Sequence, residues 1–118
     1  MSKEKVKIYV KPTCTTCRKA LRILKDRGVD FEVIDYYRKP LTVEKLRQLL
    51  KKLGLSPGEI LRKSGEMYKR LGLSKGDLSD SEVLDLMLKY PDLIQRPIVE
   101  KGNKAILARP VEKIYELL

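Results

Sequence analysis

The chain has 118 residues, of which 42% are hydrophobic and 36% charged. This predicts one globular domain, residues 1–118, with enough length for a buried core. The net charge of +10 favours anionic partners such as oxyanions, although Lys and Arg are interleaved with Asp and Glu as on an ordinary solvated surface. The absence of histidine excludes Ser-His and Cys-His catalysis, and no apolar run is long enough to cross a membrane.

The same composition bears on location and partners. The first five residues contain no apolar signal segment, so we expect a cytoplasmic protein. Persistent disulfides are rare in that reducing compartment. A single Phe and the lack of a nucleic-acid-binding motif predict no direct binding of nucleic acid.

The first third of the chain predicts a strand, a helix and a second strand. Val6–Val10 is an apolar run typical of a buried strand. Residues 16–27 carry apolar side chains at helical spacing, and Gly28 suits the C-cap. Phe31–Asp35 has the composition of a second strand, so the three elements indicate a parallel βαβ unit.

The middle of the chain predicts helices only. Thr42 can N-cap a helix that ends at Gly54. Short helices are predicted near Pro57 and over residues 66–71, and a longer helix over residues 79–89.

The last part of the chain returns to strands. Residues 97–100 and 104–107 flank a turn that contains Gly102, which predicts a hairpin, and Pro110 opens a final helix. The order βαβ, helical middle, ββα predicts an α/β, thioredoxin-like mixed sheet with a helical insertion between its two halves. The core would be residues 1–40 and 92–118, and the insertion residues 41–91, all approximately.

Cys14 and Cys17, the only cysteines, form a Cys-x-x-Cys pair between the first strand and the first helix. This context is typical of a thiol redox site, because a helix N-terminus stabilises the reactive thiolate. Two alternatives are half of a zinc site, which would lack further Cys or His ligands, and two inert buried thiols. Polar Thr15 and Thr16 disfavour the inert pair, so we predict a redox or nucleophilic site without a metal.

Three arginines are candidates for binding an oxyanion: Arg62, Arg96 and Arg109. Each is predicted near the end of a secondary-structure element, and Arg96 and Arg109 each precede a proline. A guanidinium is planar, permanently charged and bidentate, which suits a tetrahedral oxyanion. We expect these side chains at a solvent-facing cleft, although each alone is equally an ordinary surface charge.

Four segments carry a resemblance to a known family: YVKPTCTTCR (residues 9–18), LRKSGEMYKRLGL (61–73), DLIQRPIV (92–99) and LARP (107–110). Together they resemble the thioredoxin-fold arsenate reductases that couple to glutaredoxin, and their relatives, the Spx-type regulators. The resemblance implies that Cys14 is the nucleophile and that Arg62, Arg96 and Arg109 bind the oxyanion. It also implies a cis peptide bond before Pro97, beside Cys14.

The chain departs from that family at two positions. Val10 occupies the place of a histidine that assists the thiolate, so Lys11, Arg18 and the helix N-terminus are expected to lower the pKa of Cys14 instead. Familiar glutaredoxin-coupled members also lack a cysteine at the place of Cys17. An internal Cys14–Cys17 disulfide, as in Spx-type proteins, would then replace or supplement glutathione.

These observations predict a cytosolic, arsenate reductase-like thiol oxidoreductase, expected to be a monomer. It would need no tightly bound cofactor and would draw electrons from thioredoxin, or from glutathione with glutaredoxin. One alternative is an Spx-type redox sensor that binds RNA polymerase, and another is a general dithiol reductase without arsenate activity. The spacing of six residues between Arg62 and Tyr68 matches the reductases better than the regulators.

Overall fold

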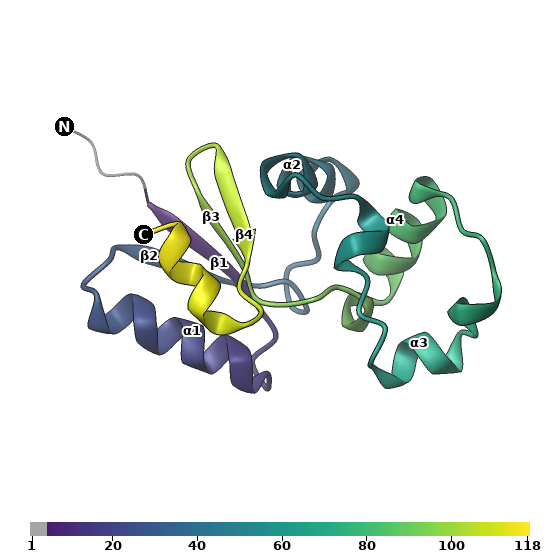
Figure 1. The fold of residues 1–118 in the computed structure, drawn as a ribbon, viewed down its shortest axis with the longest axis horizontal. Helices are drawn as coiled ribbons and strands as arrows, with labels where there is room; N and C mark the ends of the chain where they lie inside the picture. Colours follow the sequence, from purple (N-terminus) through teal and green to yellow (C-terminus); the bar gives the residue numbers. More distant parts are fainter. Residues whose placement is uncertain (1–4) are drawn as a thin grey trace. The chain divides into compact units, whose positions relative to one another are not determined.

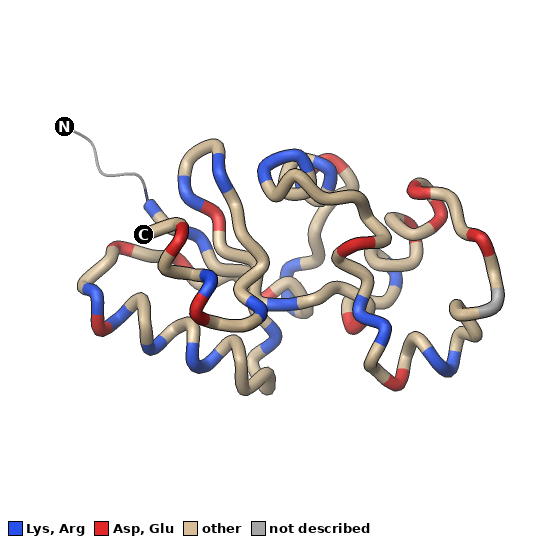
Figure 2. Tube along the Cα trace, in the orientation of Figure 1, with Lys and Arg blue, Asp and Glu red and all other residues tan. Residues whose placement is uncertain are grey.

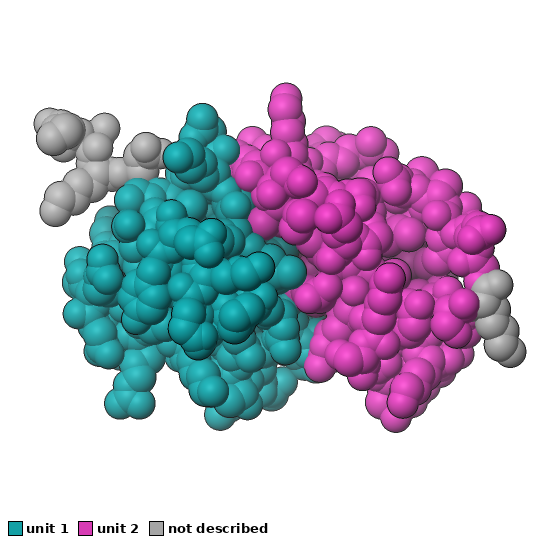
Figure 3. Space-filling model, in the orientation of Figure 1, with its two compact units in different colours: residues 1–39, 96–118 teal, residues 40–95 magenta. Residues whose placement is uncertain are grey.

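The computed structural model describes residues 5–118, and its elements follow the predicted order (Figure 1). The chain divides into two compact units, Met1–Lys39 with Arg96–Leu118, and Pro40–Gln95 (Figure 3). The predicted boundaries were near residues 40 and 92. That the whole chain is a single domain stays a prediction.

Unit 1 contains the sheet. Its elements are β1 (Val6–Val10), α1 (Thr15–Asp26), β2 (Phe31–Asp35), β3 (Ile98–Lys101) and β4 (Lys104–Leu107). The strand order is β2-β1-β3-β4. β1 and β2 are parallel, whereas β3 is antiparallel to both β1 and β4. The expected thioredoxin-like mixed sheet, with its βαβ unit and its hairpin, is confirmed.

One face of this sheet carries the hydrophobic core of unit 1. Strands alternate their side chains between faces, so Val6, Ile8 and Val10 of β1 point to the same side. They pack with Cys17, Ala20, Leu24, Val99, Ala108 and Ile114. The final helix, η4 (Val111–Glu116), is a 3₁₀ helix and lies beside α1 on this face (Figure 1). The core therefore fixes the start of α1, where the cysteines lie.

The other face of the sheet contains a buried polar pair. Tyr9 of β1 pairs with Ile98 of β3, and Lys7 pairs with Glu100, so Tyr9 and Glu100 share this face. The Tyr9 hydroxyl donates a hydrogen bond of 2.7 Å to Glu100 Oε1. Because a buried carboxylate is costly without partners, this bond offsets part of the cost of burying Glu100.

Unit 2 is helical. It contains α2 (Val43–Leu53), η1 (Pro57–Ile60), α3 (Glu66–Arg70), η2 (Leu73–Lys75), α4 (Asp80–Lys89) and η3 (Pro91–Leu93). Thr42 caps α2 by accepting a 3.0 Å bond from the Lys45 N–H, and Gly54 ends the helix at a φ of 70°. Ser79 and Glu82 form a capping box at the start of α4.

Charged residues of both signs are interspersed along the trace of each unit (Figure 2). This is the interleaving expected from the sequence. Of the helices within residues 5–118, none has the length and apolar character that crossing a bilayer requires.

Candidate active site

Cys14 is the N-cap of α1, directly before its first residue. Its Sγ accepts a 3.4 Å hydrogen bond from the backbone N–H of Cys17, one of the N–H groups that a helix start leaves without a helical acceptor. Cys14 is half-buried, and Cys17 is 1% exposed. Cys14 is therefore the more accessible of the two thiols.

The two thiols also differ in acidity. Burial opposes ionisation of Cys14, but hydrogen bonds from Cys17 and Arg96, together with the charge of Arg96, outweigh it and lower the pKa of Cys14 below its ordinary value. Burial, with a further contribution from the hydrogen bond to Cys14, raises the pKa of Cys17 to about 12. The site therefore holds one thiolate-prone sulfur beside one protonated sulfur.

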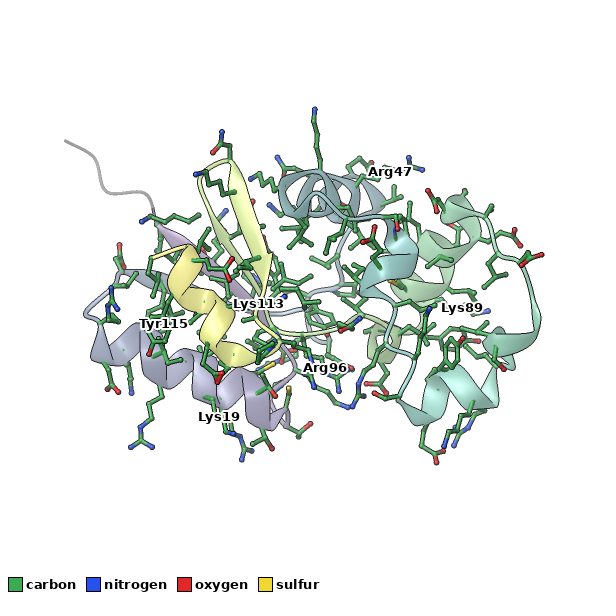
Figure 4. All side chains as sticks on the ribbon, viewed as in Figure 1. Lys19, Arg47, Lys89, Arg96, Lys113 and Tyr115 are labelled. Atoms are coloured by element: carbon green, nitrogen blue, oxygen red, sulfur yellow. The ribbon has the colours of Figure 1, made fainter. Side chains whose placement is uncertain are left out.

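Arg96 is the positively charged residue that lowers the pKa of Cys14. Its side chain (labelled in Figure 4) comes from the segment that leads into β3. Burial opposes its charge, but the nearby Tyr36, Tyr37 and Cys14 raise the pKa of Arg96. The side chain is only 4% exposed, so the expectation of a solvent-facing position is wrong for Arg96. The guanidinium makes a hydrogen bond with Cys14 instead of facing solvent.

The peptide bond between Arg96 and Pro97 is cis, as the resemblance predicted. Pro97 itself is buried, directly before β3. A second cis bond, which was not predicted from the sequence, joins Arg109 to Pro110. The two candidate arginines of unit 1 thus precede the two cis prolines.

Tyr36 and Tyr37, which were not predicted as site residues, raise the pKa of Arg96. They directly follow β2, and their turn is held by Asp35 Oδ1, which accepts a 3.0 Å bond from the Tyr37 N–H. The Tyr36 and Tyr37 rings lie 5.1 Å apart, and Lys11 Nζ lies 5.4 Å from the centre of the Tyr37 ring. A signal was present, because the carboxyl ends of parallel strands meet at one edge of a sheet.

Lys11 and Arg18 flank the cysteines as expected. The Lys11 carbonyl accepts a 3.0 Å bond from the Cys14 N–H, and Arg18 lies exposed in the first turn of α1. The contribution of their charges to the acidity of Cys14 stays a prediction.

Arg109 contacts the backbone of Arg96. Its Nη1 donates a 2.8 Å hydrogen bond to the Arg96 carbonyl oxygen. Next along the hairpin, the Ala108 N–H donates a 3.0 Å bond to the Pro97 carbonyl. The structure thus brings Arg109 to the segment that carries Arg96.

Arg62 belongs to unit 2, so its approach to Cys14 stays a prediction. It follows η1, where Leu61 forms an isolated antiparallel bridge with Ile94. The Arg62 N–H donates a 2.7 Å bond to the Leu93 carbonyl. A Cβ at Gly65 would lie 3.2 Å from Arg62 Nη1, so a glycine at this position leaves room for the guanidinium.

Comparisons with known proteins place the chain in a family. The model of the ArsC family matches residues 9–117. The chain is 39% identical to the uncharacterized protein YfgD of Escherichia coli K12, over 98% of each chain. It is 36% identical to an arsenate reductase of Escherichia coli K12, over 96% of this chain and 80% of the relative. A solved arsenate reductase from Vibrio cholerae has a TM-score of 0.91 at 36% identity, covering 99% of this chain and 100% of the other.

Proposed function

We propose a substrate and a reaction course for this chain, which belongs to the ArsC family. The family and its arsenate reductase members identify the chain as an enzyme of thiol-based reduction. The proposed substrate is arsenate. The observation that carries the proposal is the half-buried Cys14 Sγ, which has a lowered pKa and lies beside the buried guanidinium of Arg96.

In the first step, the Cys14 thiolate attacks arsenic(V), an S–As bond forms, and one arsenate oxygen leaves as water. The Cys17 N–H and Arg96 support this step because they favour the thiolate before the substrate arrives. Without such groups, two negatively charged reactants would repel each other.

Arg62, Arg96 and Arg109 are proposed to bind the oxygens of arsenate and to offset their charge. Preorganised cationic donors are typical of oxyanion chemistry, and an arginine fork matches two oxygens at once. The resemblance supports all three assignments, and the hydrogen bond between Arg109 and the Arg96 carbonyl supports a common location for two of them.

In the second step, Cys17 is proposed to attack Cys14 Sγ. An S–S bond forms, the S–As bond breaks, and its electron pair leaves with arsenic, which becomes arsenic(III). The two thiols are thereby oxidised to a disulfide, and the Cys17 proton passes to an oxygen of the departing arsenite. Cys17 suits this role because it lies one helical turn from Cys14 and its side chain is already hydrogen-bonded to it.

The disulfide would be reduced by a protein dithiol such as thioredoxin, whereas glutathione with glutaredoxin is the alternative donor. Either donor fits a cytoplasmic enzyme, since that compartment keeps thiols reduced. The proposed reaction uses no tightly bound cofactor, and it needs no metal.

The test is arsenate-dependent NADPH oxidation, measured with a thioredoxin system and a glutaredoxin system side by side. We expect Cys14→Ser to abolish activity with both donors. Cys17→Ser should abolish it with thioredoxin, because the internal disulfide can no longer form. Activity of Cys14→Ser equal to that of the parent would overturn the assignment of the nucleophile.

Arginine variants extend this test. Arg96→Lys should lower the rate by about a hundredfold, because an ammonium cannot replace the guanidinium fork. Arg62→Ala should raise the KM for arsenate. The matched control is Arg22→Lys, on the exposed side of α1. A parent protein that reduces no arsenate with either donor, but binds RNA polymerase, would favour the regulator instead.

A further inference from the structure

The segment before β3 is held by an interaction that the proposed reaction does not require. The β3–β4 ladder pairs Ile98 with Leu107, and the Ala108 N–H continues it by bonding to the Pro97 carbonyl. At the next position, the Arg96 carbonyl accepts a hydrogen bond of 2.8 Å from a side-chain atom, Arg109 Nη1. Arg109 therefore extends the ladder by one bond, at the residue that carries the guanidinium beside Cys14.

This bond is well suited to restrict the Arg96 backbone. A hydrogen bond from a charged donor is stronger than one between neutral groups, and the planar guanidinium fixes its direction. Arg109 itself is held in place, since its own N–H donates a 2.9 Å bond to the Leu107 carbonyl. The side chain thus links the end of β4 to the start of β3.

We propose that Arg109 is a positioning residue, which fixes the Arg96 carbonyl so that the Arg96 guanidinium stays beside Cys14. This role deepens the proposed function, because it concerns the same cysteine, but it operates before any oxyanion is bound. It differs from direct binding of arsenate by Arg109, since its effect reaches Cys14 through Arg96.

The titratable groups around Cys14 make this role measurable through the pKa of Cys14. Cys14 interacts with Cys17 from α1 and with Arg96 from the segment before β3. Arg96 in turn interacts with Tyr36 and Tyr37, which follow β2. If Arg96 moves away, Cys14 loses both a hydrogen bond and a positive charge, and its thiolate becomes less stable.

The experiment is the pH profile of alkylation of the reduced protein by iodoacetamide, without arsenate. Labelling of Cys14 is resolved from that of Cys17 by tandem mass spectrometry. Arg109→Met, which keeps an unbranched stem but cannot donate, should move the midpoint of the Cys14 profile to higher pH. Each unit of upward shift lowers the thiolate fraction below the midpoint about tenfold. Arg22→Met, which removes the same charge from an exposed position on α1, should leave the midpoint unchanged.

A double-mutant cycle distinguishes action through Arg96 from direct action. In an Arg96→Ala background, Arg109→Met should cause no further shift of the midpoint. Three results would each overturn the proposal. The shifts of Arg96→Ala and Arg109→Met could add fully in the double variant, or Arg22→Met could shift the midpoint as much as Arg109→Met does. The third is an unchanged midpoint in Arg109→Met.

A second variant and a separate readout keep the test independent of folding and of arsenate chemistry. Arg109→Ala is the second variant, and thermal unfolding identifies any variant that does not fold. Arsenate turnover is measured separately. If the parent reduces no arsenate while Arg109→Met still shifts the Cys14 midpoint, the proposed substrate is wrong and the positioning role stands.

Discussion

Two cysteines three positions apart have opposite properties because they occupy different places in the first turn of α1. Cys14 precedes the helix and accepts the Cys17 N–H, whereas Cys17 points into the core with Ala20 and Leu24. A helix start favours the thiolate, and burial disfavours it. The lowered pKa of Cys14 and the raised pKa of Cys17 thus follow from position.

We expect the reduced protein to be alkylated first at Cys14, with a profile centred below the ordinary pKa of a thiol. A lowered pKa means that the thiolate persists as the pH falls, so labelling at mildly acidic pH should be selective. Cys17, with a pKa of about 12, should stay unlabelled under those conditions. Cys14→Ser serves as the control and should be almost unreactive, and preferential labelling of Cys17 in the parent would contradict the assignment.

At the scale of elements, the register of β1 and β3 places Tyr9 against Glu100 on the sheet face opposite α1. Their hydrogen bond joins the two central strands, and β1 leads directly to the cysteines. The stability of this pair therefore bears on the strand that precedes the two cysteines.

Tyr9→Phe should lower the free energy of unfolding by about 1–3 kcal/mol, because it removes a donor from a buried carboxylate. Urea unfolding monitored by circular dichroism measures the change. Tyr115→Phe is the matched control, since Tyr115 is 47% exposed and its substitution should have little effect. An equal change in both variants would mean that the buried bond contributes nothing.

The same variant should alter the stability of the protein in alkaline solution. Burial and the neighbouring Glu100 raise the pKa of Tyr9 above its ordinary value of about 10. The unfolded chain then loses the Tyr9 proton at a lower pH than the folded protein, so stability falls as the pH rises above about 10. In Tyr9→Phe, the free energy of unfolding should decrease less steeply with pH above about 10 than in the parent. An identical pH dependence of the two proteins would contradict the raised pKa of Tyr9.

Elements were predictable from the sequence where their signals are local. Thr42, Gly54 and Ser79 mark helix ends through bonds to residues at most four positions away. Contacts between distant residues were not predictable in this way. Local patterns encode neither the register that brings Tyr9 to Glu100 nor the ladder that brings Arg109 to Arg96. The raised pKa of Arg96 likewise involves Tyr36 and Tyr37, which lie about sixty positions earlier in the chain.

At the scale of the whole molecule, the proposed disulfide should form within one chain. Oxidation should remove the mass of two hydrogen atoms and leave the protein at monomer mass, because Cys14 and Cys17 lie within one helical turn. Intact-mass spectrometry and size-exclusion chromatography test this, with Cys17→Ser as the control that cannot close the bond. A disulfide-linked dimer of the parent would contradict it, and a stable glutathione adduct at Cys14 would favour the glutaredoxin route.

The assignment of Arg62 concerns the whole molecule, because Arg62 belongs to unit 2 and Cys14 to unit 1. A ligand that binds only the folded protein stabilises it by about 2.7 kcal/mol at a hundredfold excess over its Kd. Arsenate or sulfate should therefore raise the Tm of the parent, and both Arg62→Ala and Arg96→Lys should reduce this rise. The control is Arg47→Ala, on the exposed side of α2 in unit 2. If Arg62→Ala keeps the full rise while Arg96→Lys loses it, the assignment of Arg62 to oxyanion binding is wrong.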